Sequence, residues 1–219
     1  MWPILLLILS PIFLFILILL ILLPFHFAIY SLINVIATPF HLLKIALNKK
    51  LRNNHALEHA TINILESKYG YRKLSGFARE DGFVIRGQID PHHLQEASML
   101  GLYQLQEGNS HLAIHTKCGT SILAANFSSA VIFLLLLWLT KSFTLFNIII
   151  AIILAQFIGP ITGRLFQKHI TTSTDVNDMT ITKVNFNQPF KSGFTNFPFF
   201  RLEGPVEYYV QTKRVKTIA

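Results

Sequence analysis

The sequence contains a single cysteine, Cys118, and only 14% of its 219 residues are charged. One cysteine excludes an intrachain disulfide, which agrees with a reducing compartment. Acidic residues are scarce, 11 against 19 basic ones, and none precedes Glu58. No basic run is interleaved with aromatic residues as in a nucleic-acid site, so we expect no nucleic acid among the partners.

The hydrophobic residues, 52% of the chain, are concentrated in long runs. Residues 2–23 carry no charge, and their one weakly polar member is Ser10. Because about 20 apolar residues cross a bilayer core, this run predicts a transmembrane helix. A cleaved signal peptide is disfavoured, since no Lys or Arg precedes the run and no small-residue cleavage site follows it.

Residues 25–47 are also mostly apolar, with Pro24 before them and Pro39 within them. Two interpretations stay open. The segment forms either a second span, in a tight helical hairpin that turns at residues 24–26, or an interfacial helix lying along the headgroups. Its length and its single late lysine favour the hairpin.

Two further apolar runs, 122–139 and 143–161, are separated only by Thr140-Lys141-Ser142 and predict a second hairpin, giving three to four transmembrane helices. Of the 19 basic residues, 17 flank this hairpin, in residues 49–117 and from Arg164 onward. By the positive-inside tendency, the middle segment and the tail lie in the cytoplasm. The net charge of +8 then reflects topology and attraction to anionic lipids, so the lipid bilayer is an expected partner.

Between the hairpins, the pattern predicts a small α-β-β-α-β soluble domain, so the expected fold class is an α+β membrane protein. Its first helix covers residues 55–68, with Asn53 or Asn54 as N-cap and Gly70 after its end. The other expected elements are strands at 74–79 and 83–89 around an Asp-Gly turn, a helix from Asp90-Pro91 to about 106, and a strand at 111–116. The first helix reads as amphipathic: one arc holds His55, Glu58, His59, Ile62 and Glu66, and Leu57, Ala60, Thr61 and Ile64 lie opposite.

The tail begins with a polar linker at 171–178 and contains two strand-like runs, 179–186 and 206–213. We expect these runs to extend the sheet of the domain. Five phenylalanines between Phe190 and Phe200 form too large an apolar patch to stay in water, and we expect them to dock on the domain. The expected regions are residues 1–48 in the membrane, 49–118 soluble, 119–165 a membrane hairpin, and 166–219 a β-rich cytoplasmic tail.

Two histidines and a carboxylate lie within five residues at the start of the soluble segment. On a helix, His55 and His59 are spaced i and i+4, so their rings leave one face about a turn apart. That spacing suits two imidazoles that share one metal ion, and Glu58 lies between them as a candidate base. The order H-x-x-E-H resembles that of inverzincin-type zinc peptidases, and the resemblance is local to these three residues.

A metal site needs a third protein ligand, and the candidates are His115 and Cys118. A strand that ends beside the helix brings an imidazole or a thiolate to its open side. Cys118 also precedes a predicted helix whose macrodipole favours a thiolate, so Cys118 and His115 form an alternative nucleophilic pair. The competing interpretation is a solvated polar helix face and a small buried cysteine at a turn.

Three stretches of the soluble core carry a further resemblance: RNNHALEHAT at 52–61, LSGFAR at 74–79, and LAIH with CGT at 112–115 and 118–120. They resemble a family of bacterial membrane proteins of unknown function that is common in cyanobacteria. The likeness covers about residues 45–165. It implies a small soluble domain held between membrane helices in the bacterial cytoplasmic membrane, and it brings no activity or cofactor.

The preferred hypothesis is a membrane-bound, zinc-dependent hydrolase, and most of all a peptidase, that acts at the cytoplasmic membrane surface. His55 and His59 hold Zn²⁺, Glu58 deprotonates the attacking water, and His115 or Cys118 completes the site. The second hypothesis is a non-catalytic membrane scaffold or assembly protein, whose domain and aromatic tail bind a protein or peptide partner.

The charge distribution generates a test of topology. A reporter fused at Ala219 should be active only if it works in the cytoplasm, and one inserted at Ser142 only if it works outside. The paired measurement uses alkaline phosphatase and green fluorescent protein at both positions. The reverse pattern contradicts the predicted orientation and, with it, the reduced state expected for Cys118.

Overall fold

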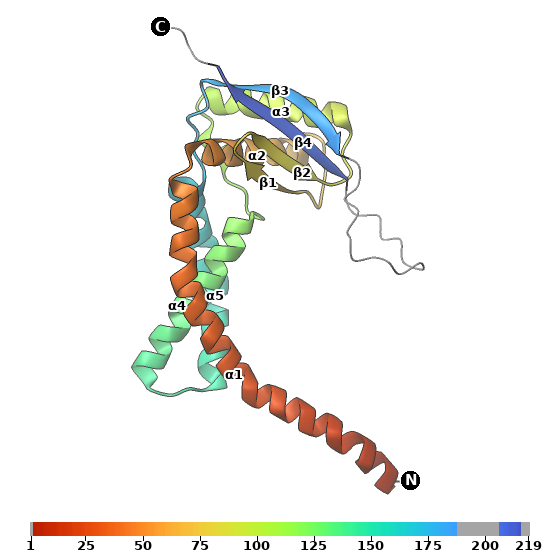
Figure 1. Cartoon of the computed structure of the whole chain (residues 1–219), viewed down its shortest axis with the longest axis vertical. Helices are drawn as coiled ribbons and strands as arrows, with labels where there is room; N and C mark the ends of the chain where they lie inside the picture. The colour runs from red at the N-terminus through yellow and green to blue at the C-terminus, as the bar shows by residue number, and fades with distance from the viewer. Residues whose placement is uncertain (1, 188–205, 216–219) are drawn as a thin grey trace. The chain divides into compact units, whose positions relative to one another are not determined.

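The structure, a computed structural model, describes residues 2–187 and 206–215 (Figure 1). The chain divides into two compact units. A helical unit contains residues 1–40 and 122–163, and an α+β unit contains residues 41–121 and 164–219. The predicted docking of the phenylalanines between Phe190 and Phe200 falls outside the described residues.

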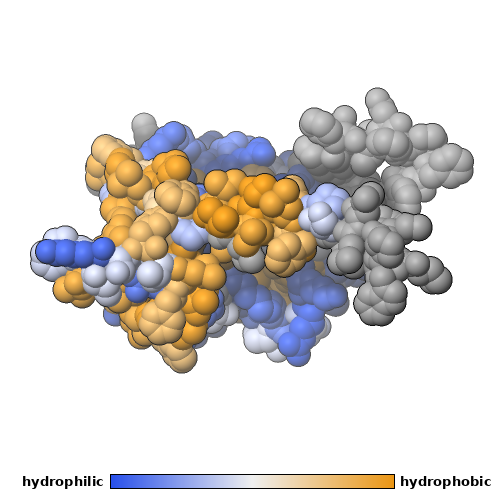
Figure 2. Space-filling view, turned by 90° about the horizontal axis from the view of Figure 1, so that it is seen from below, coloured by the Kyte–Doolittle hydropathy of each residue, from blue (hydrophilic) through white to orange (hydrophobic). Residues whose placement is uncertain are grey.

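The helical unit is built from α1 (Trp2–Ala46), α4 (Gly119–Thr140) and α5 (Leu145–Phe166), whose ends extend into the α+β unit. Three segments are long and apolar enough to cross a membrane: Ser10–Ala46, Gly119–Thr140 and Leu145–Thr171. Figure 2 shows a broad hydrophobic surface (orange) on the molecule. Large side chains such as Phe13, Phe40, Trp138 and Phe157 are more than 60% exposed, which in water is an unfavourable arrangement.

The predicted helical hairpin at residues 24–26 is wrong, because α1 runs without a break through Pro24 and Pro39. A separate second span or interfacial helix over residues 25–47 is therefore absent from the described chain. A tight turn favours Gly, Asn or Asp, and the neighbours of Pro24 are Leu23 and Phe25. A proline inside a helix removes one backbone hydrogen bond, a loss that long apolar helices tolerate.

The α+β unit contains a four-stranded antiparallel sheet with the strand order β1-β2-β4-β3 (Figure 1). Its elements are α2 (Lys49–Lys68), β1 (Ser75–Arg79), β2 (Gly82–Arg86), α3 (Pro91–Gln106), the 3₁₀ helix η1 (Ser110–Ala113), the π-helical turn η2 (Gln167–Thr171), β3 (Met179–Asn187) and β4 (Glu207–Arg214). Both tail strands join the sheet, so the predicted extension of the sheet by the tail is confirmed.

One face of the sheet packs on α2 and α3. Phe83 lies opposite Val210 in the register, and Ile85 opposite Tyr208. These side chains are buried in one core together with Leu57 of α2 and Leu94 of α3. The predicted turn between β1 and β2 and the predicted cap of α3 are also confirmed, since the Asp90 side chain accepts a hydrogen bond from the His92 N–H at 2.7 Å.

The start of α2 differs from the prediction. Asn48 is the N-cap and accepts from the Leu51 N–H at 3.1 Å, whereas Asn53 and Asn54 are buried inside the helix. Its end agrees, because Gly70 follows with a φ of 73°. The amphipathic interpretation is wrong: Glu58, His59 and Ile62 are as buried as Leu57 and Ala60 on the opposite arc. A polar helix therefore forms the centre of this unit.

The strand predicted at residues 111–116 is wrong, because residues 110–113 form η1. The reason is a side-chain partner. Asn63 of α2 donates to the carbonyl oxygens of Leu112 at 2.9 Å and Ile114 at 3.0 Å. These carbonyls are satisfied without a neighbouring strand, so alternation of polar and apolar residues is not sufficient to place this segment in the sheet.

The position of β4 generates a prediction about the tail. β4 lies between β2 and β3, and it contributes Tyr208 and Val210 to the core. A chain that ends after Thr171 should lose these contacts and leave one edge of β2 without a partner strand. We expect it to aggregate or become sensitive to limited proteolysis in detergent. Unchanged protease resistance contradicts a structural role for the tail.

Candidate metal centre

The candidate centre is built on α2, where the rings of His55 and His59 lie with centroids 4.3 Å apart and are tilted by 60°. His55 Nδ1 lies 2.9 Å from the carbonyl oxygen of Thr171, and His59 Nδ1 lies 2.7 Å from that of Ala113. Because a carbonyl only accepts hydrogen bonds, each Nδ1 carries a proton. In the neutral rings, each Nε2 is therefore unprotonated and offers a lone pair, which is the arrangement typical of metal-ligating histidines.

Cys118 brings a sulfur to the same place. Its Sγ lies 3.3 Å from His55 Nε2 and accepts a hydrogen bond from the Thr120 N–H at 3.4 Å. It is the residue directly before Gly119, the first residue of α4. One ligand atom from each of His55, His59 and Cys118 lies within 4.8 Å of the other two. Tetrahedral zinc with these ligands holds them about 3.5 Å apart, so small side-chain shifts suffice.

His59 is held in the form that binds metal. The side chain is 1% exposed, and its Nε2 is buried without a hydrogen-bond partner among the described residues. Burial first, and the neighbouring His55 second, lower the pKa of His59 well below its usual range. The ring is therefore neutral at pH 7, and its Nε2 lone pair meets no donor of the described chain. A buried acceptor in this state is costly unless a ligand engages it.

Glu58 is the second buried group with an unpaired atom. It is 4% exposed, and its Oε2 has no hydrogen-bond partner within the described part of the chain. Burial raises the pKa of Glu58 to about 8, with a smaller contribution in the same direction from Cys118 and an opposing one from His55. A carboxyl group with a pKa near the working pH is suited to proton transfer.

The space for this carboxyl group depends on Gly76 of β1. A Cβ atom at this position would come within 2.7 Å of Glu58 Oε1 and within 2.6 Å of the Val84 carbonyl oxygen. Gly76 pairs with Ile85 across the sheet, so it faces α2 from the same side as the core residues. Any larger side chain would displace either the carboxyl group or the β1–β2 pairing.

Of the two predicted third ligands, the structure brings Cys118 into the cluster. His115 is also buried, with its ring centroid 5.9 Å from that of His59, but its Nε2 lies 3.3 Å from Glu66 Oε2. Gln167, for which the sequence carries no signal, is fully buried; its side chain accepts from the His115 N–H and donates to the His115 carbonyl oxygen. Gln167 also donates to Ser121 Oγ at 2.8 Å, and so it fixes the loop that carries Cys118.

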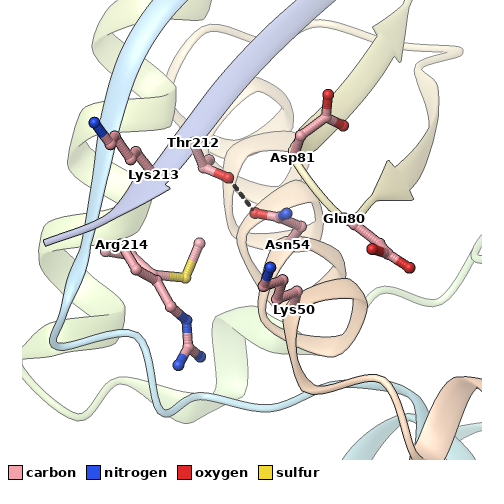
Figure 3. Close-up of a pocket in the computed structure, with 8 residues that line it drawn as sticks. Lys50, Asn54, Glu80, Asp81, Thr212, Lys213 and Arg214 are labelled. Atoms are coloured by element: carbon pink, nitrogen blue, oxygen red, sulfur yellow. Dashed lines mark hydrogen bonds between the residues drawn. The ribbon is translucent and has the colours of Figure 1, made fainter. Parts of the chain in front are cut away.

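A separate pocket of about 320 Å³ lies at the N-terminal part of α2 (Figure 3). Its charges are mixed, with Lys50, Lys213 and Arg214 against the acids Glu80 and Asp81. The Thr212 hydroxyl donates to Asn54 Oδ1 at 2.7 Å, and Asn54 in turn donates to the Arg79 carbonyl oxygen. These polar groups satisfy each other, so the pocket has the character of a structural contact rather than a reactive site.

Residues 50–184 match the family described as a domain of unknown function, DUF6391, and the chain belongs to this family. It is also 32% identical over 139 residues to an uncharacterised protein of the cyanobacterium Picosynechococcus sp., a match that covers 58% of this chain and 68% of the relative. No solved structure matches the chain. The predicted family resemblance is thus confirmed, and the matched range includes all residues of the candidate centre.

The contact between Gly76 and Glu58 generates a prediction. Gly76→Ala should destabilise the protein by about 1–3 kcal/mol, because the new methyl group overpacks a closed site. Gly119→Ala is the matched control, since its Cβ would meet no atom within 4 Å and should change stability by less than about 0.5 kcal/mol. Thermal unfolding of both variants in one detergent measures the difference. Equal melting temperatures contradict the close approach of Gly76 to Glu58.

Proposed function

We propose that this member of the DUF6391 family is a membrane-bound, metal-dependent hydrolase in which His55, His59 and Cys118 hold Zn²⁺. The observation that carries the proposal is the convergence of one ligand atom from each of the three residues within 4.8 Å, together with the burial of His59 Nε2 without a partner among the described residues. The buried lone pair of His59 Nε2 supports a ligand-binding role, because a purely structural role gives no reason to bury an acceptor without a partner.

The donor set suits zinc in particular. One thiolate and two imidazoles favour zinc over Mg²⁺ or Ca²⁺, which prefer oxygen ligands. Three protein ligands leave one position of a tetrahedral site open, as in catalytic rather than structural zinc sites. When bound, the ion supplies a lowered pKa for water and polarises a substrate carbonyl.

The residues of the chain would supply the remaining functions. Glu58 would take a proton from the attacking water and return it to the leaving group, once the charge of the bound cation favours its ionised form. The carbonyl groups of Thr171 and Ala113 orient the two imidazoles, so the ligands are held before the ion binds. Peptide hydrolysis is the preferred reaction, because the order His55, Glu58, His59 is that of the inverzincin peptidases.

The proposed location is the cytoplasmic surface of the bacterial inner membrane. Three helices of sufficient length and hydropathy support insertion in the bilayer. The basic residues of the α+β unit support a cytoplasmic position for the centre. A reducing compartment would also keep Cys118 available as a thiolate ligand.

A second candidate function is a cysteine-dependent hydrolase, which is favoured by the distance between Cys118 and His55. Cys118 Sγ lies 3.3 Å from His55 Nε2, and His55 Nδ1 bonds the Thr171 carbonyl oxygen. A thiol, a base and a group that orients the base are the parts of a cysteine-dependent hydrolase. A non-catalytic scaffold is the alternative if neither metal nor thiol reactivity is found.

Metal content after purification in a mild non-ionic detergent tests the proposal. We expect about one zinc ion per chain in the wild type and in Glu58→Gln, since Glu58 is assigned as a base and not as a ligand. Cys118→Ser and His59→Ala should each lose most of the zinc. His92→Ala, which changes an exposed histidine outside the cluster, is the matched control and should keep it.

The outcomes separate the candidates. Loss of zinc in Glu58→Gln makes Glu58 a ligand and removes the proposed base. A metal-free wild type contradicts the metallohydrolase. In that case, rapid alkylation of Cys118 that depends on His55 supports the cysteine-dependent enzyme, and slow alkylation supports the scaffold. For activity, a peptide library followed by mass spectrometry should show cleavage by the zinc-loaded wild type and none by Glu58→Gln.

A further inference from the structure

A second cavity of the α+β unit, of about 600 Å³, differs in charge from the one in Figure 3. Three of its lining residues are basic, Arg52, His111 and Lys168, and one is acidic, Asp175. The Asp175 carboxylate already pairs with Lys49 at 2.5 Å. Within the described residues, no carboxylate forms an ion pair with any of the three basic side chains. The cavity is therefore positively charged.

Arg52 is fixed in this cavity by neutral partners. Its two terminal nitrogens donate to the carbonyl oxygens of Ala46 at 3.4 Å, His169 at 3.5 Å and Thr172 at 3.0 Å. Its Nε is buried and has no hydrogen-bond partner in the described chain. Carbonyl groups orient a guanidinium but do not neutralise it, so a full positive charge is held in a set geometry beside the cavity. That arrangement is suited to an anion with several oxygen atoms.

The same contacts place the cavity at the ends of two apolar helices. Ala46 is the last residue of the candidate span Ser10–Ala46, and His169 belongs to the last turn of Leu145–Thr171. Lys168 lies in that last turn as well. Basic pockets at the ends of membrane helices are sites for phosphate-bearing lipid headgroups. Ser173 and Thr174, which also line the cavity, add hydroxyl donors for phosphate oxygens.

We infer that this cavity is a binding site for a phosphate group, carried either by an anionic lipid headgroup or by a free phosphate. The cavity has the size of a small-ligand site. It adjoins the candidate metal centre, because Ala113 lines it and also accepts the hydrogen bond from His59 Nδ1. Phosphate binding by Arg52 and Lys168 nevertheless requires no metal, and the site goes beyond the proposed hydrolase.

Isothermal titration calorimetry of the full-length protein in dodecyl maltoside tests the site with two probes, inorganic phosphate and dihexanoyl phosphatidate. Lys168 is the residue to change, because Arg52 also holds three backbone carbonyls and its loss affects folding. Lys168→Glu reverses an exposed charge and should weaken binding about tenfold or more. Lys213→Glu, at the other pocket, makes the same change in net charge and should leave the affinity unaltered.

The titrations are repeated after treatment with a chelator, since phosphate also binds zinc. Affinity that survives chelation and falls in Lys168→Glu supports the site whether or not the metal centre is present. Binding of phosphatidate alone identifies a lipid headgroup, and equal binding of both probes identifies the phosphate group as sufficient. Absence of binding by both probes, loss of binding on chelation, or equal weakening by Lys213→Glu overturns the inference.

Discussion

The α+β unit depends on the burial of a polar helix. α2 is enclosed by α3, η1 and the sheet, yet it carries a series of amide and imidazole side chains that must each find a partner. Five of them donate to backbone carbonyls of other segments: Asn53 to Ser173 and Asp175, Asn54 to Arg79, His55 to Thr171, His59 to Ala113, and Asn63 to Leu112 and Ile114. Leaving any one unpaired costs about 1–3 kcal/mol, so the helix fixes the β1–β2 hairpin, η1 and the tail in one arrangement.

Four side-chain atoms on this helix are buried without a hydrogen bond in the described chain: Arg52 Nε, Glu58 Oε2, His59 Nε2 and Glu66 Oε1. Two of them, Glu58 Oε2 and His59 Nε2, belong to the candidate centre. Burial keeps the His59 ring neutral and raises the pKa of Glu58, which makes a stable fold more difficult to attain. A bound cation reverses both effects, because it engages the imidazole lone pair and favours the ionised carboxylate. Gln167 fixes the loop from His115 to Ser121, which carries Cys118. The sulfur of Cys118 therefore lies where such an ion would require its third ligand.

Much of this arrangement was predictable from the sequence, and the errors within the α+β unit have a common cause. The apolar runs, the Asp-Gly turn, the Asp90 cap, the tail strands and the pairing of His55 with His59 follow from local chemistry and spacing. The choice of Cys118 over His115 as the third group does not, because it depends on the path of the loop from His115 to Ser121. The strand at 111–116 and the Asn53 or Asn54 cap were wrong because asparagine side chains of α2 bond distant carbonyls, and no local pattern encodes such partners. The amphipathic interpretation of α2 was wrong for the same reason. Gly76 and Gln167 act through contacts with residues far along the chain, so spacing gave no signal for them.

The central claim is that a metal ion joins His55, His59 and Cys118, and X-ray absorption at the zinc edge tests it most directly. The purified protein should show a first coordination shell with one sulfur at about 2.3 Å and two imidazole nitrogens at about 2.0–2.1 Å, with one lighter scatterer in the remaining position. The sulfur contribution should vanish in Cys118→Ser. A shell of nitrogen and oxygen only in the wild type, or a sulfur signal that survives the loss of the single cysteine, contradicts the proposed centre.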